Sequence, residues 1–189
     1  MKAICVYCGS NVGVREDYAD AARQLATHLA ASGVGIVYGG ASKGLMGVLA
    51  DEALRAGGSV VGVIPVALQA REIAHSGLTE LHVVNSMHER KALMAELSDG
   101  FVALPGGFGT LEEIVEMLTW AQLQFHAKPC GLLNAAGYFD RLLAWFDHAE
   151  GEGFVRPQHR QMLLVASEAS ELMARFEEYR APEVQKWAR

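Results

Sequence analysis

The sequence predicts an α/β fold in which helices cover both faces of a central parallel sheet. Short apolar runs alternate with longer segments of helical period along the 189 residues. Several apolar runs contain no polar residue, which is typical of strands buried on both faces. Glycines follow three of these runs, at Gly9, Gly39 and Gly106. These observations indicate a Rossmann-like three-layer sandwich with right-handed crossovers.

The individual elements follow from the same alternation. Glycine and proline mark most of their ends, and the helical segments show apolar residues at three- and four-residue spacing. Residues 66–80 show no clear period. The predicted strands are residues 3–8, 34–38, 60–64, 81–84, 101–104 and 131–133, and the predicted helices are residues 16–32, 44–55, 87–97, 111–125, 139–148 and 169–179.

The chain has the length of one domain and shows no repeat, low-complexity tract or linker. We therefore expect a single domain over residues 1–189, with residues 182–189 as a loosely held tail. In a parallel sheet the carboxyl ends of the strands form one edge, where ligands bind. The three glycine clusters are expected at that edge.

Composition excludes several classes of function. The net charge is −6 and only five residues are lysines, so a surface for nucleic acid polymers is not expected. No run reaches the roughly 20 apolar residues of a membrane span. The three cysteines are an odd number, and the chain starts with no signal-peptide pattern. We expect a cytoplasmic protein that binds a small molecule.

The most informative segment is the run LPGGFGTLEE at residues 104–113. It follows a predicted strand and opens a helix, where free N–H groups and the helix dipole favour an anion. Its glycines let the backbone approach a ligand closely. A dinucleotide fingerprint would need Gly or Ala at Glu112, so the segment favours the phosphate of a mononucleotide.

A purely structural interpretation of the same segment also fits. Thr110 and Glu113 have the spacing of a capping box, with Thr110 as the N-cap and Glu113 bonding back to it. The two interpretations are compatible, because a carboxylate can cap the helix in one state and contact a ligand in another.

A second segment, MHERK at residues 87–91, starts the helix after the fourth predicted strand. An Arg-Lys pair on a helix is usually a solvated face. Arg90 and Lys91 are nevertheless among few cations in the middle of an acidic chain, and a phosphate would need them. Arginine in particular suits bidentate contacts to phosphate.

With both segments considered, the sequence resembles the Lonely Guy family of cytokinin-activating phosphoribohydrolases. The family motif Pro-Gly-Gly-x-Gly-Thr-x-x-Glu occurs without departure from Pro105 to Glu113. The resemblance covers most of the chain, and further matching segments are Gly39-Gly40, residues 44–47, Arg71-Glu72, residues 87–91, residues 119–122 and Lys128-Pro129.

The resemblance implies hydrolysis of AMP or N6-substituted adenosine 5′-monophosphates to the free base and ribose 5-phosphate. It implies a homodimer that uses neither a metal nor a cofactor. It implies Arg90 and Glu113 as catalytic residues. The implied substrate-binding residues are Glu72, Lys91, Gly106, Gly107, Phe108, Gly109, Thr110, Leu111, Glu112 and Thr119. Members are often labelled lysine decarboxylases, but no lysine here has an evident pyridoxal-phosphate setting.

This activity suggests a role for each group. Cleavage of an N-glycosidic bond passes through an oxocarbenium-like ribose, which a nearby carboxylate stabilises. We assign Glu113 that role, together with orienting or deprotonating water. Glu112 is a weaker candidate. Residues 106–110 are expected to hold the phosphate. Arg90 is expected to contact the phosphate or ribose, or to assist the departing base.

Other signals point less clearly to chemistry. Cys5 and Cys8 form a C-x-x-C without a second pair, and the seven histidines lack metal-ligand spacing. Three rival functions remain. They are a non-catalytic nucleotide or molybdenum-cofactor carrier on the same fold, a nicotinamide-dependent oxidoreductase, and a hydrolase of other nucleoside monophosphates.

Overall fold

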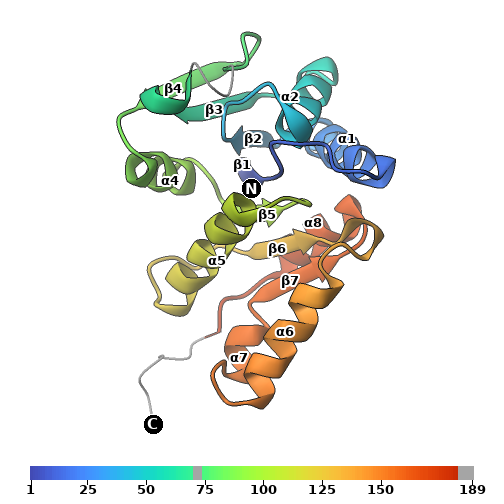
Figure 1. Ribbon diagram of the computed structural model, residues 1–189, viewed down its shortest axis with the longest axis vertical. Coiled ribbons are helices and arrows are strands. Elements are labelled where there is room, and N and C mark those ends of the chain that lie inside the picture. Colours follow the sequence, from blue (N-terminus) through green and yellow to red (C-terminus); the bar gives the residue numbers. More distant parts are fainter. Residues whose placement is uncertain (70–73, 183–189) are drawn as a thin grey trace.

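A computed structural model of the protein describes residues 1–69 and 74–182. It contains a seven-stranded sheet in the order β4-β3-β2-β1-β5-β6-β7, and each neighbouring pair is parallel. Helices pack on both faces of the sheet (Figure 1). The predicted three-layer α/β sandwich is confirmed.

The strands are short, as in most doubly wound sheets, and helices join them. The strands are β1 (Ala3–Tyr7), β2 (Gly35–Tyr38), β3 (Val60–Pro65), β4 (Glu80–Val84), β5 (Gly100–Ala103), β6 (Cys130–Leu133) and β7 (Leu163–Ala166). The helices are α1 (Glu16–Ala31), α2 (Gly44–Arg55), α3 (Val66–Gln69), α4 (Met87–Glu96), α5 (Phe108–Gln122), η1 (Ala135–Gly137), α6 (Asp140–Gly151), α7 (Pro157–Arg160) and α8 (Ala169–Glu178).

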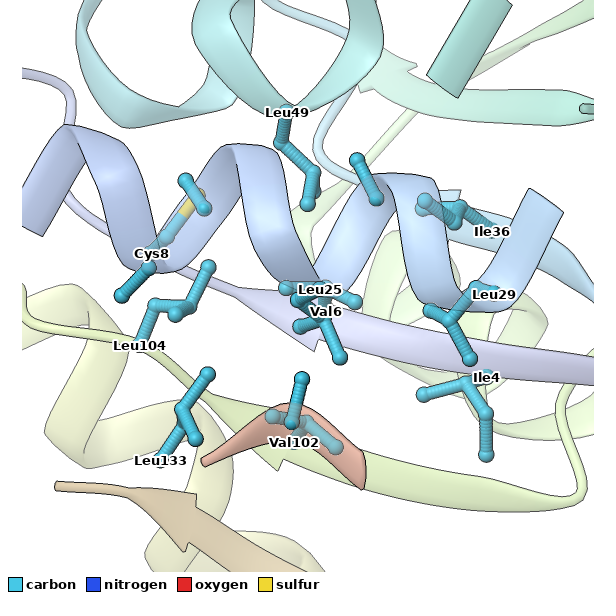
Figure 2. Close-up of a cluster of buried hydrophobic side chains, with 14 of the residues drawn as sticks. Ile4, Val6, Cys8, Leu25, Leu29, Ile36, Leu49, Val102, Leu104 and Leu133 are labelled. Atoms are coloured by element: carbon cyan, nitrogen blue, oxygen red, sulfur yellow. The ribbon is translucent and has the colours of Figure 1, made fainter. Parts of the chain in front are cut away.

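The two faces of the sheet are covered by different helices. Along β1, Ile4 and Val6 face α1, α2 and α8, whereas Cys5 and Tyr7 face α4 and α5. Figure 2 shows the first face, where Leu25 of α1 packs over β1. These side chains are almost fully buried, and each contributes about 1.5–3 kcal/mol of burial free energy. The alternation places α4 and α5 on one face.

The order of the strands fixes where a ligand can bind. The chain moves outward from β1 to β4 and then returns to place β5 beside β1. The connections after β1 and β5 therefore diverge to opposite sides, which leaves a crevice at the carboxyl ends of these two strands. As predicted, the glycines after β1, β2 and β5 lie at this edge.

The structure corrects two predictions. Helix α5 begins at Phe108 with Gly107 as its N-cap, so Thr110 is not an N-cap and the predicted capping box does not form. The spacing of a capping box is present, but the fixed turn at the glycines starts the helix earlier. Strand β7 was not predicted, although its four residues form an apolar run, because no glycine or proline marks its ends in the sequence.

None of the helices in the described residues is long and apolar enough to cross a membrane. The predicted tail falls almost wholly on residues 183–189, which lie outside the described part of the chain.

His126, in its neutral form, stabilises the end of α5 through two hydrogen bonds. The Nδ1 atom of His126 accepts from the Lys128 N–H at 3.1 Å, so its Nε2–H donates to the Met117 carbonyl at 3.0 Å. Burial lowers the pKa of His126, although the bond to Met117 opposes part of that shift. Protonation would place a second proton against the Lys128 N–H.

We therefore predict that acid weakens the fold partly through His126. An unfolded histidine has a pKa of about 6.5. The stabilisation by neutral His126 should be complete above that pH and lost as the pH falls towards the lower folded pKa. Urea denaturation at pH 7.5 and pH 5 measures this loss. In His126→Asn the loss should be smaller, and an identical loss would contradict the assignment.

Candidate functional site

A cavity of about 230 Å³ opens at the crevice between β1 and β5. The loop of residues 9–13 after β1 and the turn of residues 105–107 after β5 form two of its walls. Tyr18, Leu45 and Tyr138 complete the lining. The cavity thus lies at the point where the strand order reverses, which is where such folds bind ligands.

Main-chain hydrogen bonds join the two loops. The Gly9 N–H donates to the Pro105 carbonyl at 3.0 Å, and the Leu45 N–H donates to the Gly9 carbonyl at 3.0 Å. A Cβ on Gly106 would lie only 2.1 Å from Thr110 Oγ1, so this close packing requires glycine. The turn is therefore held by the β1 loop and by the buried Thr110, and α2 in turn holds the β1 loop.

The start of α5 leaves backbone donors for a ligand. The first four N–H groups of a helix, here those of residues 107–110, have no partner within the helix. Gly107 has no side chain with which to cap them. A Cβ on Gly107 or Gly109 would meet no protein atom within 4 Å, so the space beside both residues is open. This helix end has the features of an anion site.

Helix α4 supplies a buried arginine from the neighbouring part of the edge. Ser86 caps α4 by accepting from the Glu89 N–H at 3.1 Å. One turn later, Arg90 is only 7% exposed; its Nε donates to the Val63 carbonyl at 3.1 Å and its Nη2 to the Gly39 carbonyl at 3.3 Å. Among the described residues, Arg90 forms no ion pair.

Gly39 makes room for this arginine. A Cβ at position 39 would lie 2.2 Å from Arg90 Nη2. Gly39 therefore leaves the space that the Arg90 side chain occupies, in addition to permitting the turn after β2. The partners of the Arg90 guanidinium among the described residues are neutral, namely two carbonyl groups and the Met87 sulfur at 3.8 Å, so no carboxylate among them competes with an anionic ligand.

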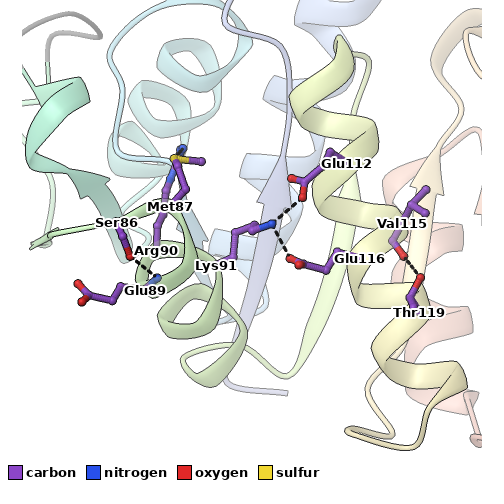
Figure 3. A network of polar contacts seen from close by, with 9 residues as sticks. All are labelled: Ser86, Met87, Glu89, Arg90, Lys91, Glu112, Val115, Glu116 and Thr119. Carbon is purple, nitrogen blue, oxygen red and sulfur yellow. Dashed lines mark hydrogen bonds and ion pairs between the residues drawn. The ribbon is translucent and has the colours of Figure 1, made fainter.

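Lys91 is directed away from Arg90 and towards α5 (Figure 3). Its Nζ lies 2.5 Å from Glu112 Oε1 and 3.0 Å from Glu116 Oε2. Burial alone would lower the pKa of Lys91, but the two carboxylates more than compensate and the pKa is raised. We call these three residues the α4–α5 clamp. It joins the helix that carries Arg90 to the helix that carries Glu113.

Arg90 and Glu113 act on the same part of β1. Burial is the main cause that raises the pKa of the Cys5 thiol, the charge of Glu113 adds to the rise, and the charge of Arg90 opposes it. The charge of Glu113 also raises the pKa of Tyr7 and Cys8, after the larger effect of burial. The charges of Arg90 from α4 and Glu113 from α5 therefore have opposite effects on the pKa of the same thiol. Glu113 is half-buried.

Comparison with known proteins identifies the family. A family described as possible lysine decarboxylase matches residues 46–176. The probable cytokinin riboside 5′-monophosphate phosphoribohydrolase LOGL9 of Oryza sativa subsp. japonica is 52% identical over 178 residues, which cover 94% of this chain and 78% of the relative. The cytokinin riboside 5′-monophosphate phosphoribohydrolase LOG1 of Arabidopsis thaliana is 48% identical over 178 residues, or 94% and 84% of the two chains.

This chain belongs to the Lonely Guy family. Solved structures with the same fold include the molybdenum cofactor carrier protein of Chlamydomonas reinhardtii, with a TM-score of 0.71, 22% identity and coverage of 94% and 96%. The molybdenum cofactor binding protein of Rippkaea orientalis has a TM-score of 0.70, 20% identity and coverage of 94% and 97%. At these identities the likeness concerns the fold.

In this Lonely Guy chain, two of the predicted site residues, Gly106 and Gly107, line the cavity. Lys91 and Glu112 pair in the α4–α5 clamp instead. Thr119 lies nine residues after Thr110 along α5, roughly 13 Å at the rise of a helix. It lines a separate, mainly apolar groove of about 220 Å³ beside α6 and α7. Glu72 lies outside the described residues. Leu111 is half-buried against the core on the α5 face, and Phe108 is exposed.

Two residues that line the cavity were not predicted from the sequence. Tyr18 and Tyr138 line the cavity, although neither belongs to a glycine-rich segment. The three cysteines are buried free thiols, and no group of three or more candidate metal ligands occurs among the described residues. The two cysteines of the C-x-x-C pattern lie on opposite faces of the sheet, because Cys5 and Cys8 belong to different core clusters.

We predict that Lys91→Met destabilises the fold by about 1–3 kcal/mol, because it leaves Glu112 and Glu116 close together without their cation. Urea denaturation measures this loss. The matched control is Arg175→Met, which breaks an exposed pair with Glu171 and should cost less than about 0.5 kcal/mol. Equal effects of the two substitutions would show that the α4–α5 clamp contributes nothing beyond an ordinary surface pair.

Proposed function

We propose that the protein hydrolyses the N-glycosidic bond of AMP and N6-substituted adenosine 5′-monophosphates, including cytokinin riboside monophosphates. The products are the free base and ribose 5-phosphate. Relatives about half identical over most of their length carry the name of this activity. An enzyme with this activity is a hydrolase that acts on N-glycosyl bonds.

The observation that carries this proposal is that elements at the carboxyl edge of the sheet supply three groups that complement a nucleotide. The N-terminus of α5 offers free N–H groups, Arg90 offers a buried positive charge, and Glu113 offers a carboxylate whose charge reaches the end of β1. A nucleoside monophosphate has a matching set of groups: a dianion, a sugar that becomes positive, and a leaving base.

The phosphate binds to the N–H groups of residues 106–110 beside the cavity. Binding there uses the helix dipole and fixes the ribose relative to the protein. The binding energy of this remote group is thereby used to orient the reacting bond. Gly107 and Gly109 leave the space that the phosphate oxygens need.

Glu113 faces C1′ of the ribose and stabilises the positive charge that develops there. Water adds to C1′ as the bond from C1′ to the purine nitrogen breaks, and the electrons of that bond leave with the base. The water loses a proton to Glu113, and the base takes one up. Arg90 stabilises the phosphate, the ribose hydroxyls or the departing base through its remaining N–H groups.

We further propose that the protein is a homodimer and is located in the cytoplasm. Exposed apolar side chains gather around the groove that contains Thr119, among them Trp145 at 59% and Val115 at 38% exposure, and Phe154 at 87% lies nearby on the loop after α6. A second copy of the chain would cover this surface, so that Thr119 of each copy would lie at the interface. Three free thiols support a reducing compartment.

The carrier hypothesis has less support. It shares the fold, but it gives no role to a carboxylate that acts beside a buried arginine at the crevice. A carrier would bind its ligand without turnover, so the two functions differ in a direct assay.

The first test is the substitution Glu113→Gln, which keeps the size of the side chain and removes its charge. We expect kcat with AMP to fall by about 100-fold or more, while the melting temperature stays close to that of the parent protein. The assay resolves free bases after incubation with AMP, GMP, CMP and isopentenyl-adenosine monophosphate. The control is Glu171→Gln on the exposed side of α8. Normal turnover by Glu113→Gln would refute the proposed role of this carboxylate.

A second test uses the open space at the start of α5. Gly109→Ala should not lower stability and can raise it by as much as about 1 kcal/mol, because alanine favours a helix and its Cβ meets no protein atom. The same Cβ would occupy space beside the phosphate, so KM for AMP should rise. Thermal unfolding and steady-state kinetics measure the two effects. Unchanged KM in both Gly107→Ala and Gly109→Ala would place the phosphate elsewhere.

A further inference from the structure

Tyr138 lies on the cavity wall opposite the N-terminus of α5, in the segment between β6 and α6. Its ring packs edge-on against Tyr18 of α1, with 5.4 Å between the ring centroids, and against Phe139 at 4.9 Å. The side chain remains 41% exposed on the cavity side. The rings of Tyr18 and Tyr138 thus form a wall beside the glycine turn, and the buried Phe139 supports it from behind.

The hydroxyl of Tyr138 contacts the turn directly. It donates a hydrogen bond to the Gly106 carbonyl at 2.6 Å. The preceding carbonyl, that of Pro105, already accepts from the Gly9 N–H at 3.0 Å. Two successive carbonyl groups of the turn are therefore held by donors from different parts of the chain.

The bond to Gly106 has a specific consequence for an anion site. The peptide between Gly106 and Gly107 joins two glycines, so its rotation meets little steric resistance. In a trans peptide the carbonyl and the N–H point in opposite directions. Rotation of this peptide would reverse its dipole and turn a carbonyl oxygen towards the space that the N–H groups of α5 face. A bond from Tyr138 to the carbonyl prevents that rotation.

The backbone before Tyr138 is held in an unusual conformation that sets this position. Ala136 and Gly137 both have positive φ, of 50° and 71°, which is unfavourable for an alanine. The side chain of Asn134 maintains the turn: its Oδ1 accepts from the Phe139 N–H at 2.7 Å, and its Nδ2 donates to Asp140 at 2.7 Å. Such strain is kept where the surrounding structure requires it.

We propose that Tyr138 is a positioning residue for phosphate binding, which locks the peptide after Gly106 so that the glycine turn presents donors and no acceptor to the anion. This inference rests on the proposed function for the identity of the ligand, since it concerns the phosphate of the nucleotide. It assigns Tyr138 no contact with the reacting bond.

The test is Tyr138→Phe, which keeps the aromatic wall and removes the hydroxyl. The inhibition constant of ribose 5-phosphate and KM for AMP should rise roughly three- to tenfold, the size expected for one lost hydrogen bond. The inhibition constant of adenine should not change, because adenine has no phosphate. Calorimetric titration with ribose 5-phosphate and with inorganic phosphate measures binding independently of turnover.

The matched control is Tyr179→Phe, which deletes the same atom from a half-buried tyrosine after α8. The pKa of Tyr179 is raised to about 12 by burial and by Cys130 at the start of β6, which places this residue towards the opposite edge of the sheet from the cavity. This variant should bind ribose 5-phosphate as the parent protein does.

The outcomes separate the inference from the proposed function. Selective weakening of phosphate-bearing ligands supports the role of Tyr138 even if the protein does not hydrolyse AMP, in which case the proposed function alone fails. Unchanged binding in Tyr138→Phe overturns the inference and leaves the function intact. Equal weakening of ribose 5-phosphate and adenine also overturns it, since that pattern indicates a general loss of structure.

Discussion

The site depends on the adjacency of β1 and β5, two parallel strands whose following connections diverge to opposite faces of the sheet. The Gly9 N–H meets the Pro105 carbonyl because these two strands are neighbours, although nearly a hundred residues separate them in sequence. Once this bond forms, the glycine turn cannot move without the β1 loop. The start of α5 and the cavity beside it follow from that constraint, since α5 begins directly after the turn.

Helices α4 and α5 carry the charged residues of the candidate site. Both pack on the same face of the sheet, so residues of each can approach the end of β1. Burial of Arg90 without a carboxylate partner among the described residues is unfavourable in itself, and two main-chain carbonyls and the space at Gly39 make it tolerable. The α4–α5 clamp uses Lys91, the chain neighbour of Arg90, and Glu112, the chain neighbour of Glu113. The ion pair between these neighbours therefore restrains the distance between the helices that carry the two charged groups.

The sequence was sufficient for the architecture and for the placement of the glycine turns at one edge of the sheet, and insufficient for the contacts between elements. Period and glycine placement predicted the sheet because burial imposes both patterns locally. The start of α5 was predicted wrongly. The spacing of Thr110 and Glu113 suits a capping box, but the glycine turn starts the helix earlier, with Gly107 as its N-cap. The bond from Tyr138 to Gly106 and the pairing of Lys91 with Glu116 left no sequence signal, because each contact depends on the packing of separate elements.

Several unfavourable features lie at the carboxyl edge of the sheet. Positive φ at Ala136, uncapped N–H groups at the start of α5, the buried charge of Arg90 and glycines inside the first turn of a helix all occur there, while the two core clusters beneath are apolar and closely packed. A core of this kind can stabilise the sheet independently of what its edge contains. This explains why carriers of the molybdenum cofactor share the fold at 22% identity. Function is set by the few edge residues, and their unfavourable conformations persist because β1, β5 and the surrounding helices hold them in place.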